Sequence, residues 1–249
     1  SKERFQSKKI VWTSSRKEIA SVDAGGTVKA KKEGSARITA SVQGTEESAA
    51  CMIKVIKKES KKNAGDVAAL KEILKTQPNA SVSSNTDDAD QYTWTDTGKE
   101  RRLTRIVWPG TGLEGELSFA GLSALEYVDC SGGSLSSLDI RENKSLKYLD
   151  CSAQELQTLD ISANKALEVL KCDQNHLSEL DIQKNPALVT LSCETNRLSQ
   201  LNTKKNPLLK ELSCGANQLS GLNISSNPAM TDLRCSSNEL TSIQISGVK

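Results

Sequence analysis

A repeat of 21 residues runs through the second half of the chain and constrains its fold more than any other feature. Each unit carries one cysteine: Cys130, Cys151, Cys172, Cys193, Cys214 and Cys235. The units begin at Leu125, and their consensus is L-x-x-L-x-C-x-x-N-x-L-x-x-L-x-I-x-x-N. A sequence with a fixed short period forms a solenoid, because one unit cannot bury its apolar side chains alone and must stack on its neighbours.

The repeat also predicts local structure. Each L-x-x-L-x-C segment ends in alternating apolar and polar residues, as in Tyr148-Leu149-Asp150-Cys151, which predicts a short strand with one face inward. The consensus asparagine after the strand (175, 196, 217, 238) is expected to satisfy backbone groups in the turn. Gly133 and Gln154 interrupt this column, so we expect looser turns there. The second asparagine column (143, 164, 185, 206, 227) is followed three times by proline, which predicts turns without a helix.

The six repeat cysteines are expected to be buried as small apolar side chains. Side chains that lie next to one another along a ladder cannot be bridged without distorting the strands. A zinc site needs four ligands that converge on one point, whereas a ladder spreads them along a line. Cysteine is also among the most buried residue types. We therefore expect no disulfide framework, no metal site and no cofactor.

The repeat resembles the leucine-rich repeat, with cysteine at the position of its third leucine, and it is similar to the short repeats of internalin-like bacterial surface proteins. This resemblance implies a solenoid over residues 103–249, with one degenerate and six regular units. Trp108 takes the cysteine position in the degenerate unit, which therefore should be a wider coil. Residues 59–102 resemble the linker and helical amino-terminal cap of such proteins, with Asp66 as helix N-cap and Val67, Leu70 and Leu74 on one helix face.

Residues 1–58 predict a separate β-sandwich, because short alternating segments are separated by glycine turns. The expected inner face of the last strand comprises Ala49, Cys51, Ile53 and Val55. The motifs V-W-T-S-S, I-A-S-V-D and G-G-T-V-K-A-K-K-E-G-S-A-R-I-T-A resemble the bacterial immunoglobulin-like domain, group 2. That family normally begins with two further strands, so the resemblance implies an N-terminally truncated domain with a partly open core. The expected fold class is therefore multidomain: an immunoglobulin-like sandwich followed by a leucine-rich repeat solenoid with an α-helical cap.

Composition argues against several classes of function. Lys+Arg 33 against Asp+Glu 31 gives no electrostatic case for nucleic acid or an anionic membrane surface. Aromatic residues are only 3%, which argues against surfaces on which bases or sugars stack. No apolar segment is long enough to span a membrane. The single histidine, His176, has no nucleophile and orienting group around it, and no phosphate-binding glycine motif occurs. We therefore predict no enzymatic activity and no catalytic residues.

The candidate binding residues are the strand residues that would point outward on the concave face of the solenoid. One row comprises Arg105, Tyr127, Tyr148, Val169 and Thr190, and a neighbouring row includes Asp129, Asp150 and Lys171. Adjacent exposed tyrosines beside an arginine are typical of protein interfaces. The alternative is that the tyrosines form a cross-strand pair that only stabilises the strands. The adjacent aspartates are more typical of a solvated surface than of a calcium site.

The sequence thus predicts a modular, non-enzymatic protein of bacterial extracellular or cell-surface type. Its expected function is protein–protein recognition through the concave face, with adhesion to a host or neighbouring-cell surface protein. One alternative is a carbohydrate-binding module that uses Tyr127, Tyr148 and the nearby aspartates. The other is a structural spacer or targeting arm of a larger secreted protein.

Overall fold

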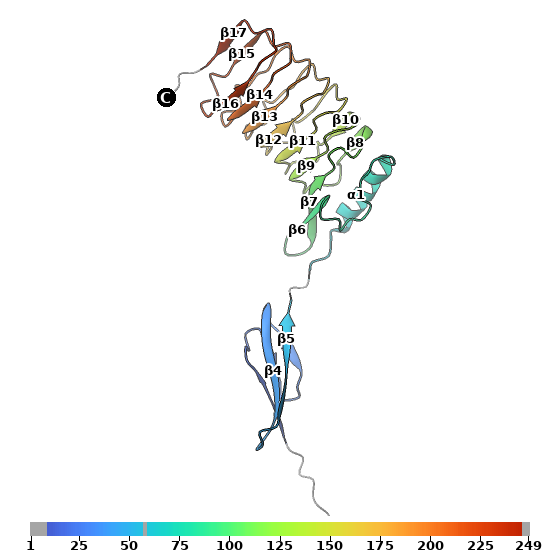
Figure 1. The fold of residues 1–249 in the computed structure, drawn as a ribbon, viewed down its shortest axis with the longest axis vertical. Helices are drawn as coiled ribbons and strands as arrows, with labels where there is room; N and C mark the ends of the chain where they lie inside the picture. Colours follow the sequence, from blue (N-terminus) through green and yellow to red (C-terminus); the bar gives the residue numbers. More distant parts are fainter. Residues whose placement is uncertain (1–8, 57–58, 246–249) are drawn as a thin grey trace, which may run out of the picture. The chain divides into compact units, whose positions relative to one another are not determined.

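The computed structural model describes residues 9–56 and 59–245, and the chain divides into two compact units between Glu59 and Ser60 (Figure 1). The first unit contains the strands β1 (Ile10–Ser14), β2 (Ala20–Val22), β3 (Val28–Ala30), β4 (Gly34–Val42) and β5 (Ser48–Val55). β4 pairs antiparallel with both β1 and β5, and β2 pairs antiparallel with β3. The expected strands of the immunoglobulin-like unit are thus present within the described residues.

The apolar core of the first unit is small. Its buried apolar side chains are Ile19, Ala20, Ala36 and Ile38, and Val55 packs against the first three. Two residues of the expected inner face, Ala49 and Cys51, are instead exposed, so this part of the prediction is wrong. Among the described residues, β2 packs on β1 and β4, whereas β5 is the edge strand of the sheet and is less covered.

The second unit is a β-solenoid. The parallel strands of its large sheet are β7 (Arg101–Val107), β9 (Tyr127–Asp129), β11 (Tyr148–Asp150), β12 (Val169–Lys171), β13 (Thr190–Ser192), β14 (Glu211–Ser213) and β16 (Asp232–Arg234). In the described part of the chain, these seven strands represent one coil each, and β6 (Tyr92–Asp96) adds an antiparallel strand beside β7. Residues 21 positions apart are therefore neighbours, as the repeat predicts.

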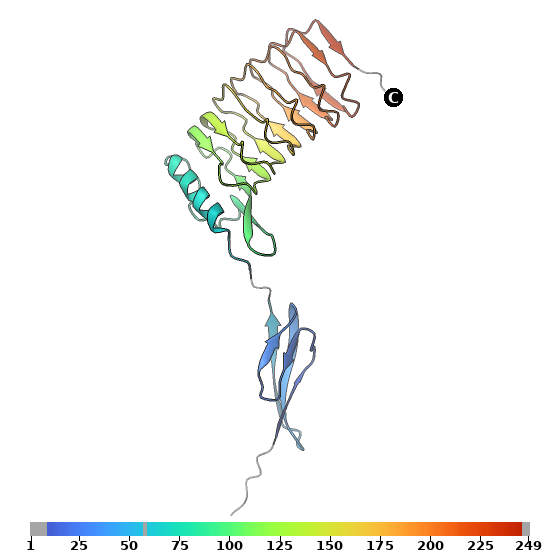
Figure 2. The same ribbon diagram turned by 180° about the vertical axis from the view of Figure 1, so that it is seen from behind.

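Two further pairs of strands lie on another side of the coils (Figures 1 and 2). β8 (Glu114–Ser118) pairs with β10 (Ser134–Asp139), and β15 (Gly221–Asn223) pairs with β17 (Ser242–Gln244), both in parallel. The coils between them have turns on this side and no helix. The solenoid is therefore built from strands and turns. No helix in the described residues is long and apolar enough to cross a membrane.

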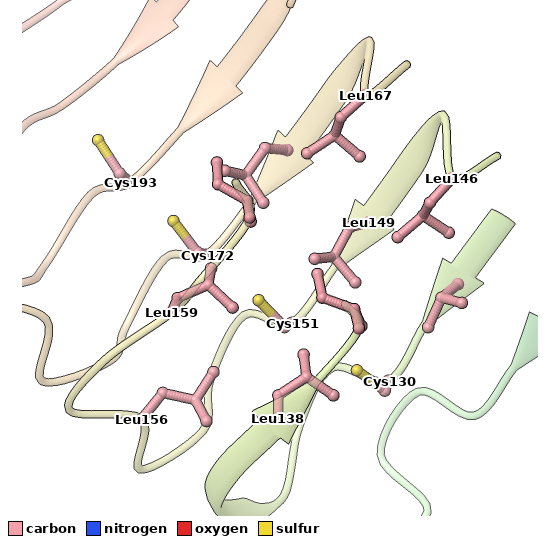
Figure 3. Packing of buried hydrophobic residues seen from close by; sticks show 14 of the residues in the cluster. Cys130, Leu138, Leu146, Leu149, Cys151, Leu156, Leu159, Leu167, Cys172 and Cys193 are labelled. Atoms are coloured by element: carbon pink, nitrogen blue, oxygen red, sulfur yellow. The ribbon is translucent and has the colours of Figure 1, made fainter. Parts of the chain in front are cut away.

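The cysteines form a ladder inside the solenoid, alongside rows of leucines (Figure 3). Cys130, Cys151, Cys172, Cys193 and Cys214 have an exposed fraction of 0%, while Cys235 in the last described coil is half-buried. The thiols of the first three donate to backbone carbonyls of the next coil over 3.5–3.6 Å. The expectation of buried thiols is confirmed for five of the six repeat cysteines and not for Cys235, and all six are free.

The degenerate first coil is closed by large side chains. Trp108 is fully buried, and its ring contacts Tyr92 edge-on and Phe119 at centroid distances of 6.1 and 5.9 Å. The helix α1 (Ala64–Thr76) adds Leu70 and Ile73 to the same apolar core. In this first coil Trp108 thus occupies the position that cysteine occupies in the later coils.

The predicted helix N-cap is wrong by three residues. The helix begins at Ala64, and the side chain of Asn63 caps it by accepting a hydrogen bond from the amide of Asp66 at 2.8 Å. The carboxylate of Asp66 is buried and binds Arg102 with both oxygens, at 2.7 and 2.8 Å. It also accepts from the Leu103 amide at 2.9 Å. Asp66 therefore anchors the helix to β7, a role that depends on residues far along the chain.

The first asparagine column connects consecutive coils. Asn196, for example, accepts from the Leu177 amide at 3.0 Å and donates to the Cys172 carbonyl at 3.0 Å, so the predicted role is confirmed. The looser turn expected at Gln154 is not found. Its longer side chain makes the same two contacts in the preceding coil, with the Leu135 amide at 2.8 Å and the Cys130 carbonyl at 2.6 Å.

The second asparagine column is fully buried but uses its side chains differently. Each amide nitrogen donates to two carbonyls of the preceding coil, as Asn185 does to Ile161 and Asn164 at 2.9 Å. The side-chain oxygens of Asn143, Asn164, Asn185 and Asn206 accept no hydrogen bond. Asn227 differs, because Thr203 stands at the consensus isoleucine position and donates to its oxygen at 2.6 Å.

Candidate functional site

The large sheet brings all eight predicted binding residues onto its outward face, and we call them the strand strip. Strand pairing aligns Arg105, Tyr127, Tyr148, Val169 and Thr190 in one row. The same register aligns Asp129, Asp150 and Lys171 in the other row. All eight side chains are half-buried. This arrangement follows from the parallel register, which fixes each residue beside its equivalent 21 positions away.

The centre of the strip is a stack of two tyrosines between two cations. The rings of Tyr127 and Tyr148 lie parallel, with centroids 4.1 Å apart and an interplanar angle of 3°. The Arg105 guanidinium carbon lies 4.5 Å from the Tyr127 ring centroid, and the Lys171 ammonium lies 5.7 Å from the Tyr148 ring centroid. Each ring therefore has a second ring on one face and a cation on the other. Burial and the neighbouring Tyr127 hydroxyl raise the pKa of the Tyr148 phenol.

The two aspartates of the strip are each held by the turn that follows their strand. Asp129 accepts from the amide and hydroxyl of Ser131 at 3.1 and 2.7 Å. Asp150 accepts from the Ser152 amide at 3.1 Å, and its other oxygen lies 3.8 Å from the Lys171 ammonium. Each carboxylate is thus fixed through one oxygen. Within the described residues, no three histidine, cysteine or acidic side chains are grouped as a metal site would require.

The site continues beyond the predicted residues, at the position that follows each cysteine. There Asp173 accepts from the Ser192 hydroxyl at 2.7 Å and from the Glu194 amide at 2.6 Å. Each coil has three outward strand positions, equivalent to Glu126, Tyr127 and Asp129, and one position after its cysteine. Over all coils, these four positions together carry eight acidic residues and five basic ones. The acidic ones are Glu126, Asp129, Asp150, Glu168, Asp173, Glu194, Glu211 and Asp232. The surface around the tyrosines is therefore acidic, although the whole chain has a net charge of +2.

Asp173 and Glu194 were missed because the prediction considered only residues within the strands. The residue that follows each cysteine also lies on the outward side of the coil. The 21-residue period could have identified this position. In a further row beside the tyrosines, Lys147 pairs with Glu126 at 2.7 Å. The hydrogen bond that Lys147 donates to Glu126 raises the pKa of Lys147. His176 lies apart from the strip, 2.6 Å from the exposed carboxylate of Glu155.

Comparisons with known proteins give a family match for the first unit and a similarity to a solved structure for the chain. Residues 2–53 match the family model described as bacterial Ig-like domain (group 2), which confirms that resemblance. No curated protein sequence matches the chain. Among solved structures, the chain is similar to the functional domain of InlJ from Listeria monocytogenes, which also includes a cysteine ladder. The two are 17% identical with a TM-score of 0.37, and the match covers 71% of this chain and 61% of that one.

Proposed function

We propose that this chain is a protein-recognition module of an extracellular or cell-surface bacterial protein, and that the strand strip contacts the partner. The observation that carries this proposal is the stack of Tyr127 and Tyr148 between Arg105 and Lys171 on the outward face of the sheet. Tyrosine and arginine contribute most to the affinity of many protein interfaces. The match of residues 2–53 to the bacterial Ig-like domain supports the bacterial surface setting.

The rigidity of the stack favours binding. Tyr127 and Tyr148 stand on paired strands, and each contacts a neighbour on both ring faces. Binding therefore needs little ordering of these side chains, and this lowers its entropic cost. Their ring edges and hydroxyls remain for a partner, within a border of the fixed carboxylates Asp129 and Asp150. An aromatic centre with a polar border is the usual anatomy of a protein interface.

The same geometry argues against carbohydrate binding by the tyrosines. A sugar ring stacks on the open face of an aromatic ring, but both faces of Tyr127 and Tyr148 are already covered by each other and by the two cations. A glycan at this position would have to displace Arg105 or Lys171. We therefore favour a protein partner, such as a host or neighbouring-cell surface protein. The role of a spacer would then belong to the immunoglobulin-like unit.

The test is a double substitution, Tyr127→Ala with Tyr148→Ala, in the whole chain. Immobilised protein is incubated with solubilised surface proteins of candidate host cells, and captured proteins are quantified by mass spectrometry. We expect the variant to lose a set of proteins that the parent captures, while its melting temperature falls by only a few degrees, because an aromatic pair contributes about 1 kcal/mol.

The matched control is Gln157→Ala with Ser178→Ala, two exposed positions outside the strands of the large sheet. This control should capture the same proteins as the parent. If capture persists in the tyrosine variant while its stability drops sharply, the tyrosines only stabilise the strands and the proposal is wrong.

A further inference from the structure

A hollow lies away from the strand strip, where β15 pairs with β17. Its volume is about 520 Å³, within the range of small-molecule sites. Its floor includes the buried side chains of Leu201 and Leu222. The polar groups around that floor are neutral except for one lysine: Gln200, Asn202, Lys204, Asn223, Ser242 and Gln244. The site therefore offers an apolar base and a border of groups that both donate and accept hydrogen bonds.

Gly221, which has no side chain, is part of the lining of the hollow. The equivalent positions of other repeats carry Ser137, Thr158, Glu179, Gln200 and Ser242. Gly221 does not have a positive φ, and a Cβ placed there would lie 3.5 Å from the Ser242 hydroxyl, an ordinary contact. Neither the backbone conformation nor packing therefore requires glycine at this position. Its effect is to leave open space above the leucines.

The polar row beside the hollow changes in character along the solenoid. Earlier coils carry Asp160 and Asp181 where the later coils carry Asn202, Asn223 and Gln244. The turn does not require this change, because Asp160 and Asn202 both accept from the amide two residues further on, at 2.9 and 3.1 Å. The side-chain amides of Asn202, Asn223 and Gln244 add hydrogen-bond donors that the aspartates lack. Asn223 donates to the Gln244 side-chain oxygen at 2.6 Å, while the Asn202 amide nitrogen has no hydrogen bond to a described residue.

We propose that this hollow binds a neutral sugar unit of a glycan. Adjacent hydroxyls of a sugar each donate and accept a hydrogen bond, and side-chain amides provide both partners at once. The apolar C–H face of the ring would lie on Leu201 and Leu222. A cationic ligand fits less well, because Lys204, the one charged residue of the lining, is positive. This site lies on a different side of the coil from the strand strip and is independent of the function proposed above.

The test is a glycan array that presents neutral oligosaccharides of glucose, galactose, mannose and N-acetylglucosamine to the labelled whole chain. Gly221→Leu fills the hollow, and Asn202→Asp keeps the turn but removes the amide donor. We expect each change to weaken binding at least tenfold. The matched controls, Thr158→Leu and Asp160→Asn, make similar changes at equivalent positions of another coil and should leave binding unchanged.

Three results would overturn this inference: no binding of any neutral glycan by the parent chain, binding that persists in both hollow variants, or loss of glycan binding in the Tyr127→Ala, Tyr148→Ala variant. The last result would place the sugar on the strand strip. Thermal melting of each variant shows that it is folded, and Asn202→Asp keeps the inference testable if Gly221→Leu does not fold. Capture of protein partners by the strip is measured separately, so either proposal can fail alone.

Discussion

The cysteine ladder should make the solenoid sensitive to alkaline pH. Burial raises the pKa of the Cys214 thiol to about 12, and it raises the pKa of the Cys151, Cys172 and Cys193 thiols well above their usual value. The unfolded chain has thiols that ionise near pH 9. Since the pKa of each thiol is higher in the folded state, its stabilising effect is fully present below about pH 9. That effect is lost as the pH rises toward the folded value.

The expected loss is large because the ladder repeats it. At pH 10 each unfolded thiol gains roughly 1–2 kcal/mol by ionising, while the buried thiol stays protonated. Five thiols are fully buried, so the free energy of unfolding should fall by roughly 5–10 kcal/mol between pH 8 and pH 10. That is comparable with the whole stability of a typical domain, about 5–15 kcal/mol. We therefore expect the solenoid to be close to unfolding at pH 10, so that little urea is needed to unfold it there.

Urea unfolding at pH 8, 9 and 10 measures this loss, with a reducing agent present and tryptophan fluorescence as the probe. Cys172→Ala should reduce the pH dependence by about one proton. The exposed Cys51 provides the control, because Cys51→Ala should leave the dependence of the solenoid unchanged. If stability at pH 10 stays within about 1 kcal/mol of its value at pH 8, the thiols ionise inside the folded solenoid and the reasoning fails.

Two further predictions concern the asparagine columns and are tested by urea unfolding at pH 7. Asn196→Ala should cost about 3 kcal/mol, because it leaves the buried Leu177 amide unpaired, whereas the Cys172 carbonyl keeps its bond from Asn175. Asn185→Ala should cost at least about 2 kcal/mol less, because the carbonyls it serves also accept backbone amides; equal costs would contradict this account. Ile182→Thr should change the free energy of unfolding by less than about 1 kcal/mol, because the new hydroxyl can pair with Asn206 as Thr203 does with Asn227. Ile106→Thr should instead cost roughly 2–3 kcal/mol. Similar costs at both isoleucines would refute the pairing.

The parts of the structure that the sequence predicted are those that follow from the period. Residues 21 apart must be neighbours in stacked coils, so Tyr127 beside Tyr148 and the buried cysteine row could be read from spacing alone. The degenerate coil was predictable for the same reason, because Trp108 stands where the other coils have cysteine. Each of these inferences depends on strand separation, which backbone hydrogen bonding fixes at about 4.8 Å.

The errors arose where a side chain binds a partner outside the repeat register. Asp66 has the features of an N-cap, but its carboxylate pairs with Arg102 far along the chain, and Asn63 caps the helix instead. Gln154 departs from the asparagine consensus, yet its length lets it reach the same backbone groups. Local patterns do not contain these distances, so propensity and consensus gave the wrong answer.

The sequence by itself determined the solenoid, its strand register and the rows of residues that face outward, because a strict period leaves the chain one way to bury its leucines and cysteines. Tertiary structure decided how the outward side chains meet. The tyrosines lie face to face because their strands fix them one coil apart, and cations from the neighbouring coils cover the remaining ring faces. Likewise, the hollow at Gly221 depends on the side chains of adjacent coils, which no single repeat specifies.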